Sequence, residues 1–370
     1  MIPKRLSKIA IYLPDLSGGG AERLQVNLAQ IFLNRGVAVE FVLDRAEGPL
    51  LDAVPPKATV ISLGCKRVLQ SLPKLARYLR EQKPDILLSN LGHNNIIALW
   101  ARRLARSGTK IVVAQHNMLS GESLREGYKY RYLPLFYRLF LPWADGIVAV
   151  SQGIGEDVAM MTGLPMSRIT VIYNGVVTAD FEAKANLPVA HPWFGDASRL
   201  PVFVAVGRLV WQKDFPTLLR AFAKVVAHKS ARLVILGEGP LRAELTSLAA
   251  ELGISDSLDL AGFKPNPLPF MRQASVVVLS SRFEGFAMVL AEALACGAKI
   301  VSTDCQHGPS EILEKGNYGI LTPVEDSDAL AAAMLAALDA PADKEKLTKR
   351  GQKFSLETCG QQYLDLFERL

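Results

Sequence analysis

Short apolar runs alternate along the chain with longer stretches in which apolar residues recur at helical spacing. Runs that are apolar at every position are typical of parallel strands covered on both faces, and their alternation with helices indicates βαβ units. The first series of expected strands covers residues 9–13, 37–43, 86–89, 111–114, 146–150 and 170–173. The second covers residues 202–206, 232–236, 258–261, 276–279, 299–302 and 319–321. The pattern predicts an α/β protein with two doubly wound sheets.

The 370 residues exceed what one hydrophobic core usually supports, so two domains are expected. An irregular, proline-containing stretch at 177–201 separates the two strand series and fits an interdomain linker. We predict one domain at 1–178 and another at 200–354, with a helix at 355–370 that can cross back to the first domain. Doubly wound sheets place ligands at the carboxyl ends of their strands, and a substrate bridging the two domains would bind there.

Composition narrows the class of protein. The four cysteines have no CxxC spacing and no histidine at metal-ligand distance, so reduced thiols of a cytoplasmic protein are expected. The apolar run at 9–13 is too short for a signal peptide core or a membrane span. The net charge is +6, and the basic excess lies in residues 1–180. Such an excess fits either an anionic partner or a solvated basic face.

The segment from Glu284 to Glu292 follows the expected strand at 276–279 and opens a helix. Gly285 permits a sharp turn, and the first free N–H groups of the helix, near residues 286–288, form a site for an anion. The two carboxylates can then accept hydrogen bonds from sugar or ribose hydroxyls while backbone N–H groups hold a phosphate. Glu-Gly at a helix start is also common elsewhere, so this segment alone leaves a purely structural interpretation open.

The segment resembles the E-x7-E motif of retaining glycosyltransferases of family 4 (glycosyl transferases group 1), which have the GT-B fold of two Rossmann-like domains. The stretches at 207–209 and 212–215 are similar to the family's G-R-L and K-G segments, in which an arginine and a lysine, here Arg208 and Lys213, bind the donor pyrophosphate. Two such cations can neutralise a nucleotide diphosphate leaving group. Asp214 stands where the family often has glycine, which is expected to change the local backbone.

The resemblance covers nearly the whole chain, as far as the Gly-Pro-x-Glu-Ile segment at 308–312. The glycine-rich loop at 18–20 follows the first strand and is similar to the family loop that approaches donor phosphates or acceptor. His116 follows a strand where the family often presents a histidine to the transferring sugar, although a single histidine there is more often structural. The implied catalytic residues are Glu284 and His116. The implied donor-binding residues are Gly18, Gly19, Gly20, Arg208, Lys213, Gly237, Phe263, Lys264, Gly285, Phe286, Ala287, Met288 and Glu292.

The resemblance implies a retaining transferase that moves a hexose or N-acetylhexosamine from a nucleotide diphosphate sugar to a glycan or lipid-linked acceptor, in cell-envelope polysaccharide or glycolipid synthesis. A UDP-sugar is the first expectation for the donor and a GDP-sugar the second. No cofactor and no metal are expected, because Arg208, Lys213 and helix N–H groups supply the positive charge. Residues 326–328 spell the D-x-D of a metal-dependent transferase, but they precede an alanine-rich run and are expected to cap a helix.

Aromatic and basic residues interleave from Tyr128 to Trp143, and Arg102, Arg103 and Arg106 lie nearby in sequence. Such a segment suits the interface of an anionic membrane and a lipid-linked acceptor, or equally a core helix whose cations extend to water. We therefore expect a cytoplasmic protein, attached peripherally to the inner face of the cytoplasmic membrane if the first interpretation holds.

Two other functional classes are weaker. A nucleic-acid-binding protein could use the basic half, but the chain has no RNP, KH, zinc-finger or basic-zipper signature, so no nucleic-acid partner is expected. A sugar-nucleotide epimerase shares the tandem architecture but is not expected to carry the E-x7-E segment. Donor hydrolysis measured with and without acceptors separates epimerase from transferase.

Overall fold

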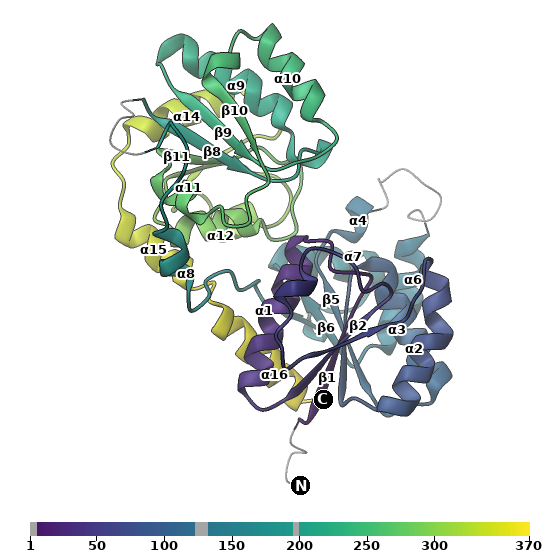
Figure 1. The fold of residues 1–370 in the computed structure, drawn as a ribbon. Coiled ribbons are helices and arrows are strands. Elements are labelled where there is room, and N and C mark those ends of the chain that lie inside the picture. The colour runs from purple at the N-terminus through teal and green to yellow at the C-terminus, as the bar shows by residue number, and fades with distance from the viewer. Residues whose placement is uncertain (1–5, 123–131, 195–199) are drawn as a thin grey trace. The chain divides into compact units, whose positions relative to one another are not determined.

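A computed structural model describes residues 6–122, 132–194 and 200–370 of the chain (Figure 1). The chain divides into two compact units. Residues 1–175 and 356–370 form the first unit, and residues 176–355 form the second. The C-terminal helix therefore belongs to the first unit, although the whole second unit separates it from Gly175 along the chain.

The first unit is built on a seven-stranded parallel sheet of order β3-β2-β1-β4-β5-β6-β7. Its strands are β1 (Lys8–Leu13), β2 (Ala38–Leu43), β3 (Thr59–Ser62), β4 (Ile86–Asn90), β5 (Lys110–Gln115), β6 (Gly146–Ala149) and β7 (Ile169–Val171). Ile9 pairs with Val39 of β2 on one side and with Ile86 of β4 on the other. The expected strand series is found here with one addition, β3.

Helices cover both faces of this sheet. They are α1 (Gly20–Asn34), α2 (Val68–Gln82), α3 (Gly92–Ala105), α4 (Leu119–Glu122), α6 (Leu133–Phe140), α7 (Gln152–Thr162) and α16 (Leu356–Glu368), with 3-10 turns η1 (Leu51–Ala53), η2 (Leu141–Trp143) and η3 (Met166–Arg168). Ile9 and Ile11 pack into one cluster with α1 and α16, while Ala10 points to the other face and is equally buried. Figure 1 shows α16, in yellow, beside α1. This contact is close, because a Cβ on Gly360 would lie 2.6 Å from the Ile31 side chain.

The second unit repeats the plan with six parallel strands of order β10-β9-β8-β11-β12-β13. They are β8 (Val202–Val206), β9 (Arg232–Leu236), β10 (Leu258–Gly262), β11 (Val276–Leu279), β12 (Ile300–Thr303) and β13 (Ile320–Thr322). The helices are α8 (Phe181–Ala185), α9 (Phe215–His228), α10 (Arg242–Glu251), α11 (Leu268–Gln273), α12 (Met288–Ala295), α13 (Pro309–Ile312), α14 (Ser327–Asp339) and α15 (Lys344–Gln352), with 3-10 turns η4 (Trp211–Lys213) and η5 (Ser255–Ser257). Phe203 packs with α9, α10 and α14, while Val202 and Val204 pack on the other face.

Both sheets have a topological switch point, where the chain order of neighbouring strands reverses. It lies between β1 and β4 in the first unit and between β8 and β11 in the second. Open parallel sheets bind ligands at the carboxyl ends of the strands beside this point. The loops after β1, β4, β8 and β11 are therefore where binding side chains should gather.

Two expectations from the sequence are corrected. Strand β3 was not expected, because this edge strand is mostly exposed and has no sustained apolar run. The stretch expected as an interdomain linker belongs to the second unit from Val176 onward. Within it, His191 bonds Asp259 at 2.8 Å, and Phe194 packs against Phe270 of α11. The aromatic residues of this stretch are therefore anchors on the second sheet.

Candidate active site

The loops after β8 and β11 meet in a buried ion pair. Lys213 Nζ lies 2.5 Å from Glu284 Oε1, and the two side chains are 15% and 9% exposed. Ser281 Oγ donates a second hydrogen bond to the same carboxylate oxygen at 2.6 Å. The structure thus brings together one of the expected pyrophosphate cations and the first glutamate of the E-x7-E segment. It adds Ser281, which the sequence analysis did not single out.

Further hydrogen bonds join the same two loops. The Arg282 N–H donates to the Gln212 carbonyl at 2.9 Å, and Gln212 Nε2 donates to the Phe283 carbonyl at 2.9 Å. Ser280 Oγ donates to the Lys213 carbonyl at 2.7 Å. Because backbone and side-chain bonds tie both loops, the positions of Lys213 and Glu284 are set together.

Asp214, which stands where the family often has glycine, has a backbone conformation that favours glycine. Its φ is +46°, in the left-handed region. The side chain is 1% exposed and accepts hydrogen bonds from Thr217 Oγ1 at 2.9 Å and Arg282 Nη2 at 3.0 Å. Arg282 also pairs with Glu325. Charge-assisted hydrogen bonds can offset the cost of a left-handed non-glycine residue.

Arg208, the other expected pyrophosphate cation, follows β8 and is exposed. It forms no ion pair with any residue of the described ranges. Arg208 is thus an exposed cation on the same loop as Lys213, after β8, where it can meet an anionic ligand at the switch point.

The helix that follows Glu284 begins at Met288, with Ala287 before it at a φ of +52°. The expected anion-binding N–H groups at 286–288 thus lie at the loop-to-helix junction. Glu292 is one turn into α12 and half-buried. Its negative charge adds to burial in raising the pKa of the Cys296 thiol to about 12. The two glutamates therefore occupy different surroundings, one in the loop network and the other on the helix.

Three further expected donor residues follow β9 and β10. A Cβ on Gly237 would lie 1.9 Å from the Gly207 carbonyl oxygen, so only glycine fits this approach of the two loops. Phe263 is 59% exposed, and Lys264 beside it is half-buried. These residues stand at the same sheet edge as Arg208, and an exposed phenyl ring there offers a flat apolar surface for a base.

In the first unit, the glycine-rich loop joins β1 to α1. Gly18 has a φ of +95°, and Gly19 precedes Gly20, the first residue of α1. The loop thus lies at the switch point, directly before the N-terminus of a 15-residue helix.

His116 follows β5 and is 8% exposed. Burial lowers its pKa to about 4, so the imidazole is neutral near pH 7. Its Nε2 lies 3.1 Å from Asn90 Oδ1, and Gln25 Nε2 donates to the same oxygen at 2.9 Å. The sequence analysis missed Asn90 and Gln25. The only signal was an amide at the end of β4 and another on the apolar face of α1.

The D-x-D sequence is a helix cap, as expected. Asp326 accepts hydrogen bonds from the N–H groups of Asp328 and Ala329, at 3.0 and 2.9 Å, at the start of α14. Across the described residues, no group of three or more His, Cys, Asp and Glu side chains is placed to hold a metal ion.

The aromatic and basic segment is divided between core and surface. Residues 128–131 lie outside the described ranges, and α6 covers most of the rest. Tyr137 of α6 is 1% exposed and donates to Gln115, whereas Phe136 and Leu139 are 44% and 52% exposed. Trp143 stacks against the guanidinium of Arg103 at 3.6 Å. One side of α6 is therefore core, and the other presents apolar groups to water.

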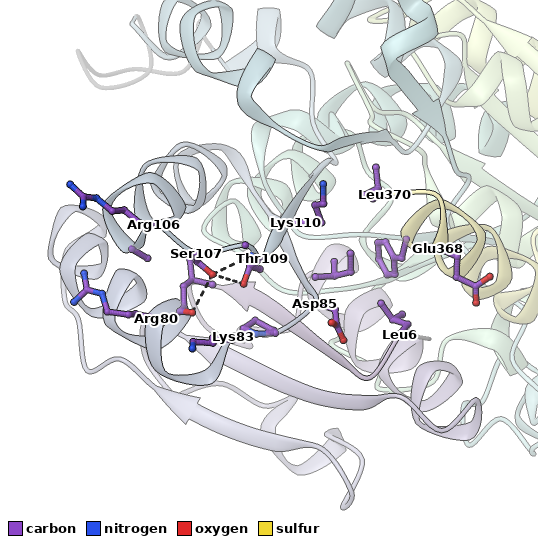
Figure 2. A pocket seen from close by; sticks show the side chains of 16 residues that line it. Leu6, Arg80, Lys83, Asp85, Arg106, Ser107, Thr109, Lys110, Glu368 and Leu370 are labelled. Carbon is purple, nitrogen blue, oxygen red and sulfur yellow. Dashed lines mark hydrogen bonds between the residues drawn. The ribbon is translucent and has the colours of Figure 1, made fainter. Parts of the chain in front are cut away.

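Two cavities lie away from the carboxyl ends of the first sheet. One, of about 230 Å³, is lined by Leu99, Arg102, Arg103, Arg106, Ser107 and Trp143. The other, of about 630 Å³, opens at the amino ends of β4 and β5, where Figure 2 shows Lys83, Asp85 and Lys110 around it. Residues Arg106 and Ser107 line both. Neither cavity contains an expected catalytic or donor-binding residue.

Tandem doubly wound units, with cations and a helix N-terminus at the switch point of the second, define the class of GT-B glycosyltransferases. Residues 18–180 match the family model Glycosyltransferase Family 4, and residues 194–354 match Glycosyl transferases group 1. The lipopolysaccharide core biosynthesis glycosyltransferase LpsD of Rhizobium meliloti is 30% identical over 367 residues, which is 95% of each chain. The chain belongs to this family and is a glycosyltransferase.

Other similar proteins agree with this membership. The N-acetylgalactosamine-N,N'-diacetylbacillosaminyl-diphospho-undecaprenol 4-alpha-N-acetylgalactosaminyltransferase of Campylobacter jejuni is 27% identical over 345 residues, covering 90% of this chain and 91% of that protein. A glycosyltransferase from Rickettsia africae superposes with a TM-score of 0.81 at 17% identity over 99% of both chains. HepE from Anabaena, in complex with UDP and glucose, has a TM-score of 0.77 at 21% identity over 98% of this chain and 100% of that one. The family membership favours the transferase over the epimerase alternative.

Within the described ranges, no helix is both long enough and apolar enough to cross a bilayer.

Proposed function

We propose that the protein is a retaining glycosyltransferase that moves a hexose or N-acetylhexosamine from a UDP-sugar to a glycan or lipid-linked acceptor in cell-envelope synthesis. The observation that carries the proposal is the Lys213–Glu284 pair at the β8/β11 switch point, with Arg208 exposed on the same loop as Lys213. The names of the Rhizobium and Campylobacter relatives support an envelope or lipid-linked acceptor. The UDP bound to HepE supports the choice of base.

The division of labour follows from charge and position. The diphosphate leaving group gains negative charge as the glycosidic bond breaks, and Arg208 and Lys213 stabilise that charge. Lys213 and Ser281 hold the Glu284 carboxylate. In the proposed role, Glu284 orients the sugar and acts on charge at its anomeric carbon. Glu292, on α12, binds the nucleotide ribose, and His116 contacts the transferring sugar. These roles are the ones that the family resemblance implies for the same positions.

A transfer assay with matched variants tests the donor site. Arg208→Ala and Lys213→Ala should each lower turnover roughly ten- to hundredfold, because each removes a charge-assisted contact worth about 1.5 to 3 kcal/mol. Arg220→Ala removes an exposed cation from α9 and should leave turnover unchanged. Chelation by EDTA should leave most activity intact, since protein groups carry the positive charge. Wild-type rates in both donor-site variants, or activity that EDTA abolishes and Mg²⁺ or Mn²⁺ restores, would contradict the proposal.

The nucleotide base can be tested by thermal shift. A ligand at 100 times its dissociation constant stabilises a protein by about 2.7 kcal/mol. UDP-sugars should therefore raise the melting temperature at concentrations where GDP-sugars do not. The reverse ranking would replace the UDP-sugar by a GDP-sugar. Interconversion of donor sugars without transfer to any acceptor would favour the epimerase.

The peripheral membrane contact is proposed for the surface formed by α3, α6 and η2, called here the α3–α6 face. Exposed Trp100, Phe136 and Leu139 supply apolar groups, and Arg103 and Arg106 supply positive charge beside them. The Trp100 side chain is 39% exposed. The centroid of its ring lies 5.0 Å from that of Phe140 in α6 and 5.4 Å from that of Trp143 in η2. Aromatic and basic side chains on one face suit the interface of an anionic bilayer, where a lipid-linked acceptor resides.

Sedimentation with vesicles tests this contact. Vesicles containing phosphatidylglycerol should bind the protein and release it at high salt, whereas neutral phosphatidylcholine vesicles should not. Phe136→Ser with Leu139→Ser, and separately Arg106→Gln, should weaken binding. Met160→Ser on α7, at 72% exposure, and Lys57→Gln are matched controls that should bind normally. Equal binding to both kinds of vesicle, or binding that the controls affect as strongly, would contradict the α3–α6 face.

A further inference from the structure

Three segments of the first unit are joined at a single amide oxygen. Gln25 lies on α1 behind the glycine-rich loop, Asn90 ends β4, and His116 follows β5. Gln25 and Asn90 are fully buried. Asn90 Oδ1 lies 2.9 Å from Gln25 Nε2 and 3.1 Å from His116 Nε2. The orientation of the His116 ring is therefore coupled to α1, the helix that follows the glycine-rich loop.

The chemistry of the three groups decides where the imidazole proton lies. Asn90 Nδ2 faces the Leu88 carbonyl at 3.4 Å, which directs the carbonyl end of the amide to Gln25 and His116. A carbonyl oxygen accepts two hydrogen bonds and donates none, so His116 Nε2 has to be the donor. Burial lowers the pKa of His116 to about 4, so the ring holds one proton near pH 7. Nδ1 then carries a lone pair.

Nδ1 is available for a ligand. It has no hydrogen-bond partner among the described residues, and it is not among the unpaired polar atoms that are shielded from solvent. The opposite tautomer would place the lone pair of Nε2 against that of Asn90 Oδ1 and leave the buried oxygen with one donor, which is unfavourable. The two amides therefore select a ring that accepts a hydrogen bond at its accessible nitrogen.

We propose that Asn90 and Gln25 are positioning residues that hold His116 as the neutral Nε2–H tautomer, so that its Nδ1 accepts a hydrogen bond from a hydroxyl of the transferring sugar. The second half of this statement rests on the proposed transferase function. A histidine held in this way accepts a hydrogen bond that a sugar hydroxyl donates, and it does not serve as a general acid near neutral pH. Asn90 and Gln25 thus set the preference for a hydroxyl next to His116 Nδ1 without contacting the sugar themselves.

Nitrogen NMR measures the tautomer directly. In protein labelled with ¹⁵N-histidine, long-range proton–nitrogen spectra distinguish the protonated from the bare ring nitrogen, and His116→Gln identifies the signals among five histidines. The wild type should show Nε2–H with an unprotonated Nδ1. Asn90→Leu should shift the population toward Nδ1–H, whereas Asn90→Asp keeps an acceptor and should retain Nε2–H. Asn95→Leu, which removes a buried amide bonded to Tyr137, is the matched control and should leave the His116 signals unchanged.

Turnover gives the second readout. Asn90→Leu should lower kcat at least tenfold, Asn90→Asp should recover most of it, and Gln25→Leu should lie between them. An Nδ1–H tautomer in the wild type, or an unchanged tautomer in both Asn90→Leu and Gln25→Leu, would overturn the proposal. Wild-type kcat in His116→Gln would overturn its link to the reaction. If the wild type transfers no sugar from any nucleotide donor, the proposed function fails while the spectra still decide the tautomer. Should Asn90→Leu not fold, Gln25→Leu and Asn90→Asp carry the test.

Discussion

Replacing Lys213 alone should lower the free energy of unfolding more than replacing both Lys213 and Glu284 by uncharged residues. In Lys213→Met, the Glu284 carboxylate stays 9% exposed, and among the described residues the Ser281 hydroxyl is the one partner that remains to it. An uncompensated buried charge costs about 3 to 5 kcal/mol, and the residual hydrogen bond places the expected loss near 3 kcal/mol. In a unit of this size, about 3 kcal/mol corresponds to a melting temperature roughly 6 to 12 °C lower. The double variant Lys213→Met with Glu284→Gln should recover most of that loss.

Calorimetry of the second unit's unfolding, combined with the transfer assay, tests this expectation. The matched control is Lys224→Met, which breaks a pair to Asp328 whose side chains are 41% and 86% exposed. Exposed pairs contribute about 0 to 1 kcal/mol, so the control should melt close to wild type. The double variant should be stable but should still lose turnover at least tenfold. A double variant as unstable as Lys213→Met, or a Lys213→Met no less stable than the control, would refute the buried-charge argument.

Three further predictions concern single positions. Asp214→Gly should be about 1 kcal/mol more stable than Asp214→Ala in urea unfolding, because glycine favours the left-handed backbone, and equal stability would contradict this. As pH falls from the ordinary histidine pKa of 6.5 to about 4, the unfolded chain binds a proton that buried His116 does not. Wild-type stability should therefore decline over this range, and the decline should be smaller in His116→Gln. Glu284→Gln should depress kcat and Glu292→Gln should raise the donor KM, and the opposite pattern would reverse their assigned roles.

Much of the architecture was determined by local sequence. The strands of both sheets, apart from β3, were predicted because a strand covered on both faces is apolar at most of its positions. Edge strand β3 could not be predicted in this way, since Thr59 and Val60 face water. The residues at 181–194 also read as linker, because two prolines interrupt their short apolar stretches. This pattern does not reveal that α8 packs on α11 or that an aromatic cluster packs on the second sheet.

At the candidate site, the sequence alone placed residues at the ends of strands. The family resemblance selected Arg208, Lys213 and Glu284, and strand order then brought the last two within hydrogen-bond distance. What no local pattern could supply was the partner of each buried polar group. Asn90 and His116 are 26 residues apart, and their contact exists only because β4 and β5 are neighbours in the sheet. A buried polar atom needs a partner, and the tertiary structure alone decides which one is within reach.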